Sequence, residues 1–427
     1  MSMIFYQLVL FLVRPLVILR LWLRARSESE YGLRQSERFG LVPGSVQKGS
    51  VWFHTVSAGE TIAAASLIRE LKGIFPDIPF LVTTMTPAGS AQVQERLSDV
   101  VSHCYAPYDF GSAVDAFFAT VEPRVLVLME TELWPNWVQR ASSRNIPIMV
   151  VNARLSARSA RGYGRLGNLV REMLGGIELF ACQTVAHRDR FIGLGADPDR
   201  VIVSGSVKYD QTLPDDFSVR VNELRHQFGI SEGESVWIAA STHPGEDEIV
   251  LTAHQLLRER IQNLRLILVP RHPVRVDAVA MLCQSAGFVV GKQSETSLQQ
   301  DIDIVLGDVM GTLLYLYGLA DVAFLGGSFE EIGGHNPIEP ALCQIPVVSG
   351  PHQYNFTDVM ETMSQAGGLV TVTDAQELAR VAADWLGNDE IRSQAGRSIA
   401  KVVTANRGAQ EKVRELVGTR IAATILE

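Results

Sequence analysis

Short, almost continuously apolar runs recur along the whole chain, separated by stretches with an apolar residue every three or four positions. Runs of this kind are typical of strands buried on both faces of a sheet. Seven fall in the first half: Val51–Val56, Phe80–Thr86, Val101–Tyr105, Val125–Met129, Pro147–Asn152, Leu179–Thr184 and Val201–Gly205. Seven fall in the second half: Val236–Ser241, Arg265–Val269, Gly287–Gly291, Asp303–Leu306, Val322–Leu325, Pro346–Ser349 and Leu369–Val372. Their alternation with helices predicts an α/β fold with two Rossmann-like parallel-sheet domains.

The segment 208–233 is expected to link the two domains, because its stretch 211–216 is polar and has no strand pattern. The first domain then spans 27–207 and the second 234–427. The pattern of Ala409–Leu426 predicts a final helix, which we expect to cross back toward the first domain. Open parallel sheets bind ligands beyond the carboxyl ends of their strands, so we expect both sheets to present these ends to a central cleft.

The first 26 residues form a separate segment that we interpret as a membrane-associated helix. Met1–Leu23 is apolar, with no acidic residue and no small-residue cleavage site, which argues against a removable signal peptide. It is almost long enough to span a bilayer, but Arg14 and Pro15 lie in its middle. A spanning anchor, a helix lying in the interface and a buried first helix all remain open. Both membrane positions place the body in the cytoplasm, with a basic collar toward anionic lipid headgroups: Arg24, Arg26, Arg34 and Arg38.

Composition narrows the functional classes. The net charge of −9 argues against a nucleic-acid partner. The four cysteines are far apart and form no CxxC pair, so neither a zinc ribbon nor a disulfide scaffold is indicated. The histidines are scattered, and Asp301-Ile302-Asp303 precedes a strand instead of following one. We therefore expect no metal site and no cofactor.

Polar residues follow the strands of the first domain. Ser57 and Glu60 match a helix capping box, and Gly59 between them would let a substrate approach closely. The alternative is that Glu60 is a general base at the mouth of the cleft. Glu130 and Glu132 follow another strand, where Glu132 has the competing interpretation of a helix cap.

Two cationic residues complete this set. Arg154 follows the next strand of the first domain, and Lys208 lies at the domain junction. Lys208 could reach an anionic group that bridges the domains, although a single lysine is usually a solvated surface charge.

The second domain carries residues suited to anions. Arg271 and His272 follow its second strand and suit phosphate recognition. Four strand ends are rich in glycine, which favours a nucleotide: Ser241–Glu246, Gly307–Thr312, Gly326–Ser328 and Gly333-Gly334. Asn336 and Pro337 predict a helix N-terminus that would attract phosphate, and Glu339 is either part of that cap or a carboxylate for ribose hydroxyls.

The chain resembles the Kdo (3-deoxy-D-manno-octulosonic acid) transferases of Gram-negative lipopolysaccharide synthesis over nearly its whole length. The resemblance rests on five stretches: Val56–Glu60, Glu130–Asn136, Gly205–Asp210, Val269–Pro273, and Gly326–Ser328 through Gly333–Pro340. It implies the GT-B glycosyltransferase architecture and an N-terminal anchor in the inner membrane. It also implies CMP-Kdo as donor and the tetraacylated lipid A precursor as acceptor.

Matching positions suggest roles for individual residues. The resemblance implies that Glu60 is the general base of an inverting transfer and that Glu130 and Lys208 stabilise the transition state. It assigns the CMP contacts to nine residues: Arg271, His272, Met310, Gly311, Thr312, Asn336, Pro337, Ile338 and Glu339. Candidates on the acceptor side are Ser57, Gly59, Glu132 and Arg154.

Two other functions compete with this one. One is another membrane-associated GT-B enzyme that uses a UDP-sugar donor, which nucleotide binding would distinguish. The other is a non-catalytic nucleotide-sugar sensor or scaffold, in which Glu60 would be dispensable.

Overall fold

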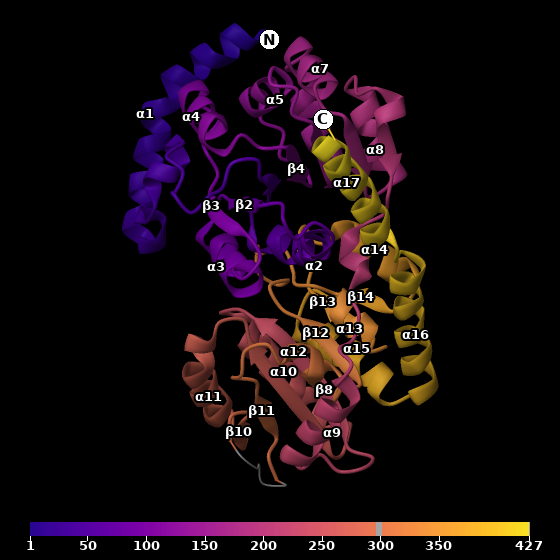
Figure 1. The fold of residues 1–427 in the computed structure, drawn as a ribbon. Coiled ribbons are helices and arrows are strands. Elements are labelled where there is room, and N and C mark those ends of the chain that lie inside the picture. Colours follow the sequence, from indigo (N-terminus) through magenta and orange to yellow (C-terminus); the bar gives the residue numbers. More distant parts are fainter. Residues whose placement is uncertain (296–300, 427) are drawn as a thin grey trace. The chain divides into compact units, whose positions relative to one another are not determined.

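The computed structural model describes residues 1–295 and 301–426 of the chain (Figure 1). These residues form two compact units. The first consists of Met1–Asp210 together with Arg407–Glu427, and the second of Gln211–Asn406. Each unit is built around one seven-stranded sheet in which all neighbouring strands are parallel.

The first unit orders its strands β3-β2-β1-β4-β5-β6-β7. The strands are β1 Val51–His54, β2 Phe80–Thr84, β3 Ser102–Tyr105, β4 Val125–Met129, β5 Ile148–Ala153, β6 Leu179–Cys182 and β7 Val201–Val203. The α-helices are α1 Met3–Ser27, α2 Ala58–Ile74, α3 Pro87–Leu97, α4 Gly111–Val121, α5 Pro135–Ser142, α6 Ala157–Gly164, α7 Asn168–Gly175, α8 Val185–Gly193 and α17 Ala409–Leu426. Short 3₁₀ turns are η1 Ser29–Gly32, η2 Gln35–Phe39, η3 Pro198–Arg200 and η4 Val207–Asp210.

The second unit orders its strands β10-β11-β9-β8-β12-β13-β14. The strands are β8 Ser235–Thr242, β9 Leu264–Pro270, β10 Val290–Lys292, β11 Ile304–Leu306, β12 Val322–Leu325, β13 Val347–Ser349 and β14 Leu369–Thr371. The helices are α9 Phe217–Gln227, α10 Glu246–Arg258, η5 Pro273–Arg275, α11 Val276–Ser285, α12 Leu313–Tyr317, α13 Ile338–Leu342, α14 Thr357–Gln365, α15 Ala375–Leu386 and α16 Asp389–Ala405.

The predicted α/β class with two parallel sheets is confirmed, and each of the fourteen apolar runs overlaps a strand. The segment 208–233, expected as a linker, contains helix α9, which packs on α12 within the second unit. The final helix α17 has the predicted bounds. It packs on α2 and on strands β4 and β5 of the first unit.

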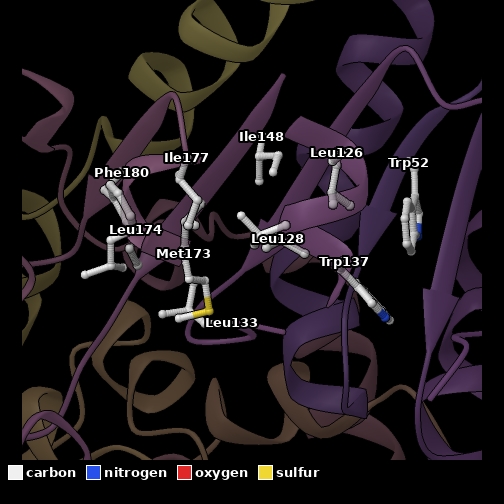
Figure 2. Packing of buried hydrophobic residues seen from close by; sticks show 14 of the residues in the cluster. Trp52, Leu126, Leu128, Leu133, Trp137, Ile148, Met173, Leu174, Ile177 and Phe180 are labelled. Carbon is white, nitrogen blue, oxygen red and sulfur yellow. The ribbon is translucent and has the colours of Figure 1, made fainter. Parts of the chain in front are cut away.

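The core of the first unit explains why its strands lack polar alternation. Trp52, Leu126, Leu128 and Ile148 point to one face of the sheet, where they pack with Trp137 of α5 (Figure 2). Neighbouring positions point to the opposite face, which α2 and α17 cover. Both faces are therefore apolar. Burying each large side chain contributes about 1.5–3 kcal/mol.

Helix α1 lies along the first unit and contacts it through polar groups. The Tyr6 hydroxyl donates to Asp109 Oδ2 at 2.8 Å, and Gln7 Nε2 donates to Asn136 Oδ1 at 3.3 Å. Further along, the Arg14 guanidinium lies 5.4 Å from the Phe110 ring centroid. Most of the apolar side chains of α1 are exposed, including Phe11 at 71% and Leu16 at 63%. The helix is thus docked on one side and presents an apolar surface on the others.

Candidate active site

Glu60 sits in the first turn of α2 and completes the predicted capping box. Its backbone N–H donates to Ser57 Oγ at 3.4 Å, while its carboxylate accepts from the Val56 backbone N–H at 2.7 Å. Ser57 Oγ also donates to Glu60 Oε1 at 3.1 Å. A carboxylate at this position satisfies backbone donors that the helix leaves free. The side chain is therefore fixed in orientation by the start of its own helix.

Glu130 directly follows β4 and is held by two cations. Lys208 Nζ lies 3.0 Å from Glu130 Oε1, and Arg154 Nη1 lies 3.6 Å from Glu130 Oε2. The Glu130 side chain is only 14% exposed. Its backbone is left-handed, with φ of 59°, a conformation that costs a non-glycine residue about 1–2 kcal/mol. Such strain is frequent at functional sites, and here it directs the carboxylate toward Lys208.

Glu132 belongs to the same group of carboxylates. It accepts a hydrogen bond from Trp134 Nε1 at 3.1 Å, so it does not cap α5. Burial raises the pKa of Glu132 to about 7, with a further contribution from the Glu130 charge. Burial also raises the pKa of Glu60 to about 8, and Glu130 and Glu132 add to the shift. The start of helix α2 and its capping hydrogen bonds favour an ionised Glu60, but burial and like charges outweigh them.

The structure thus brings together six of the predicted residues of the first domain: Ser57, Glu60, Glu130, Glu132, Arg154 and Lys208. Gly59 lies on the exposed turn of α2, where an added Cβ would meet only Ser57 Oγ, at 4.0 Å. The space above this turn is therefore open to an approaching molecule.

In the second unit, the glycine-rich end of β12 has a structural role that we did not predict. The buried Glu246 carboxylate accepts from the backbone N–H groups of Gly327 at 2.7 Å, Ser328 at 2.9 Å and Phe329 at 3.0 Å. These donors are occupied by the protein itself. Gly326 is required because a Cβ there would lie 2.5 Å from the Ser241 carbonyl oxygen. This strand end is therefore a closely packed turn and not a phosphate-binding loop.

Arg271 and His272 are exposed after β9, as expected for ligand contacts. Met310 and Gly311 are also exposed, in the loop that leads into α12. The Thr312 hydroxyl in that loop donates to the Val309 carbonyl at 2.8 Å and is tied to Gln293 at 3.0 Å. The loop is thus ordered by its own side chains and leaves Met310 free for contact.

Asn336 and Glu339 are neighbours at the start of α13. Asn336 Oδ1 accepts from the Ile338 N–H at 3.0 Å, and its amide donates to Glu339 Oε1 at 3.2 Å. Pro337 directly precedes the helix, which spans only Ile338–Leu342. A helix of little more than one turn has a weak dipole, so any ligand here would be bound mainly by side chains.

Sequence reasoning missed the role of two histidines. His243 follows β8 and His335 precedes α13, and their Nε2 atoms are 3.0 Å apart. Both belonged to stretches that we had noted for their glycines and prolines, but nothing in the sequence shows that two residues so far apart meet. Within residues 1–295 and 301–426, no group of three His, Cys, Asp or Glu side chains is arranged to hold a metal ion.

Comparison with known proteins identifies the family of this chain. The profile of the family "3-Deoxy-D-manno-octulosonic-acid transferase (kdotransferase)" matches residues 34–211. A 3-deoxy-D-manno-octulosonic acid transferase from Haemophilus influenzae is 36% identical over 417 residues, covering 97% of each chain. One from Bordetella pertussis is 35% identical and covers 94% of this chain and 95% of the relative.

Solved structures agree with the fold. A glycosyltransferase from Rickettsia africae matches with a TM-score of 0.55 at 12% identity, covering 88% of this chain and 99% of the other. The C-terminal CMP-Kdo binding domain of WaaA from Acinetobacter baumannii is 31% identical, with a TM-score of 0.42, and covers 44% of this chain and 97% of that domain. The full-length matches show the GT-B architecture that the two sheets predict. By its identity to full-length relatives, this chain belongs to the Kdo transferase family, the glycosyltransferases that add 3-deoxy-D-manno-octulosonic acid in lipopolysaccharide biosynthesis.

Proposed function

We propose that this enzyme transfers Kdo from CMP-Kdo to the tetraacylated lipid A precursor (lipid IVA) with inversion at the anomeric carbon. The observation that carries the proposal is the Glu60 carboxylate, held beside the Glu130–Lys208 ion pair on an open turn. Inversion needs a single base, which removes the proton from the acceptor hydroxyl as that hydroxyl attacks. Glu60 is proposed as this base, with Ser57, Gly59, Glu132 and Arg154 on the acceptor side.

Glu130 and Lys208 are proposed to stabilise the charges that develop during transfer. The anomeric carbon gains positive character as its bond to phosphate breaks, and a carboxylate can offset that charge. Lys208 can offset the charge that the departing phosphate gains. The 3.0 Å ion pair supports these roles because it fixes both groups before the substrates bind.

The second unit is proposed to bind the CMP moiety. Arg271 and His272 would contact phosphate or base, and the loop Met310–Thr312 would offer backbone groups to cytosine. Asn336, Pro337 and Ile338 would position Glu339, whose carboxylate would accept the ribose hydroxyls.

A substitution at Glu339 tests this assignment. Glu339→Ala should weaken CMP binding by about 1–3 kcal/mol, because charged hydrogen bonds to ribose are lost. Isothermal titration calorimetry measures the effect, and an unchanged melting temperature shows that the fold is intact. Unchanged CMP affinity would exclude Glu339 from the ribose site.

Helix α1 is proposed to lie in the cytoplasmic interface of the inner membrane instead of crossing it. Its contacts to the first unit run from Tyr6 near one end to Arg24, whose guanidinium lies 4.5 Å from the Tyr31 ring centroid. A helix flanked by a folded domain over most of its length has no free span to insert. Its exposed apolar side chains suit the acyl boundary, and the exposed Arg24 and Arg26 suit phospholipid headgroups. Arg38, which we expected in the basic collar, is buried instead.

The decisive experiment is reconstitution with defined substrates. Purified enzyme is incubated with CMP-Kdo and lipid IVA, and mass spectrometry should detect the acceptor mass increased by Kdo. Lipid IVA with a UDP-sugar is the matched control and should remain unmodified. Stabilisation by UDP and not by CMP in a thermal-shift assay would favour the alternative UDP-dependent glycosyltransferase.

A further inference from the structure

The His243–His335 pair has the geometry of a hydrogen bond that shares one proton. Their ring planes are within 6° of parallel and their centroids are 5.2 Å apart, with the two Nε2 atoms 3.0 Å from each other. The rings thus meet edge to edge through these nitrogens. In the neutral pair, one Nε2–H donates and the other Nε2 accepts. A second proton fits on the outer Nδ1 of the donating ring, which converts the contact into a stronger, charge-assisted hydrogen bond.

The charges around the pair come from the segments that follow β8, β9 and β12. From the end of β9 come Arg271, Arg275 and His272, whose ring centroid lies 5.7 Å from that of His243. From α10 comes the Glu246 carboxylate, which is already used by four backbone donors. Glu330, after β12, lies close to Gly245, which is two residues after His243. Arg275 is ion-paired with Asp247, so Arg271 supplies the cationic charge on this side, which suits an anion.

Burial favours the neutral form of both histidines. Burial, followed by the charges of Arg271 and the neighbouring histidines, lowers the pKa of His335 to about 3. Burial lowers the pKa of His243 as well, although Glu246 opposes the shift. An anion bound beside Arg271 would oppose this shift, because it would offset the cations and favour a charged imidazole.

We propose that the His243–His335 pair takes up one proton from solvent when the phosphate of the donor nucleotide binds, and so becomes a cationic clamp on the leaving group. The proposal rests on the proposed CMP site at Arg271. The phosphate is a monoanionic diester in the sugar nucleotide and a dianionic monoester in released CMP. A protonated pair would meet this extra charge without any movement of the chain. His243 and His335 thus bind the phosphate and do not act as the base.

Proton uptake is measured directly by calorimetry. CMP is titrated into the full-length protein at pH 7.5 in buffers that differ in ionisation heat, and the slope gives the protons taken up. The parent protein should take up roughly one proton per CMP, and its affinity should strengthen by up to about tenfold per pH unit as the pH falls toward 7. His335→Gln keeps a hydrogen-bonding partner for His243 but cannot share the charge, so uptake should disappear. His243→Gln should behave in the same way.

The matched control is His226→Gln, an exposed histidine on α9 of the same unit. It should retain full proton uptake, and the ionisation of CMP itself is common to all variants. Melting temperatures of the two Gln variants near that of the parent exclude a loss of fold. CMP binding without proton uptake in the parent, or unchanged uptake in both variants, would overturn the clamp and leave the proposed CMP site standing. Failure of the parent to bind CMP would overturn both.

Discussion

Two opposing electrostatic effects set the protonation state of the Glu60 carboxylate. As part of the capping box it accepts from the Val56 N–H, which favours the ionised form. Burial and the charges of Glu130 and Glu132 favour the protonated form and prevail. Sequence could identify Glu60, because capping boxes and family motifs are local patterns. It could not give the protonation state, because that depends on carboxylates brought in by other strands.

The rate of transfer should therefore depend on Glu60 losing a proton. With a pKa raised to about 8 by burial, most of this group is protonated at neutral pH. We expect kcat/KM to rise with pH through neutrality and to level off above about 8. Steady-state rates from pH 6 to 9 with fixed ionic strength check this. A profile that is flat below pH 7 would show that the free enzyme already holds Glu60 ionised.

Replacement of Glu60 separates its two roles. Glu60→Gln keeps the cap but cannot accept a proton, so turnover should fall by ~10²–10⁴-fold while CMP still binds. Between pH 4.5, the ordinary pKa of the group, and about 8, the folded protein holds more protons than the unfolded chain, so stability falls as pH rises. Glutamine does not titrate, so Glu60→Gln lacks this fall in stability. Its melting temperature at pH 8 should be no lower than that of the parent. Turnover within a few-fold of the parent would transfer the base role to Glu130 or Glu132.

At the scale of elements, the sequence predicted the strands better than the turns that follow them. Strands buried on both faces leave a continuous apolar signature, whereas the left-handed backbone of Glu130, Asn152 and Ser241 has no glycine to mark it. The position of α1 was open for a similar reason. Its composition fits spanning, lying flat and burial alike, and the interfacial position is proposed from its contacts to Asp109 and Asn136.

The exposed side of α1 should control membrane binding. Phe11→Gln combined with Leu16→Gln removes apolar surface without touching the docked side, so flotation with anionic phospholipid vesicles should decrease while the melting temperature stays the same. Tyr6→Phe is the contrasting variant. It removes the hydrogen bond to Asp109 and should lower stability by about 1–3 kcal/mol with less effect on flotation. Undiminished flotation of the double variant would show that this surface does not face lipid.

At the scale of the whole molecule, the chain leaves the first unit at Asp210 and re-enters it at Arg407. Helix α17 then buries Val413, Val417 and Ile421 in the core of the first unit, and Asp210 accepts from the backbone of Gly408 and Gln410. The sequence predicted this helix and the direction of its return. It could not identify the face of the sheet that the helix covers, because many helices of this chain have similar apolar stripes.

Disruption of α17 should damage the first unit selectively. Val417→Asp places an unpaired carboxylate in the core, which we expect to destabilise that unit by about 4 kcal/mol. Transfer activity should be lost while CMP binding by the second unit persists. Lys412→Asp puts the same residue on the exposed side of the helix and should be nearly neutral. Calorimetric scans and CMP titrations of both variants report this, and a loss of CMP binding in Val417→Asp would argue against independent units.

The return of α17 also sets an order on biosynthesis. A chain emerges from the ribosome amino-terminus first, at about 5–20 residues per second, and folds as its parts become available. Helix α1 is therefore synthesised early and the sheet of the second unit is complete by Asn406, but the sheet of the first unit lacks one of its covering helices until Ala409–Leu426 has been synthesised. Until then part of its apolar face is open to water, chaperones and the bilayer. The carboxylate cluster proposed to carry the chemistry thus belongs to a unit that is completed only after the second unit has been synthesised.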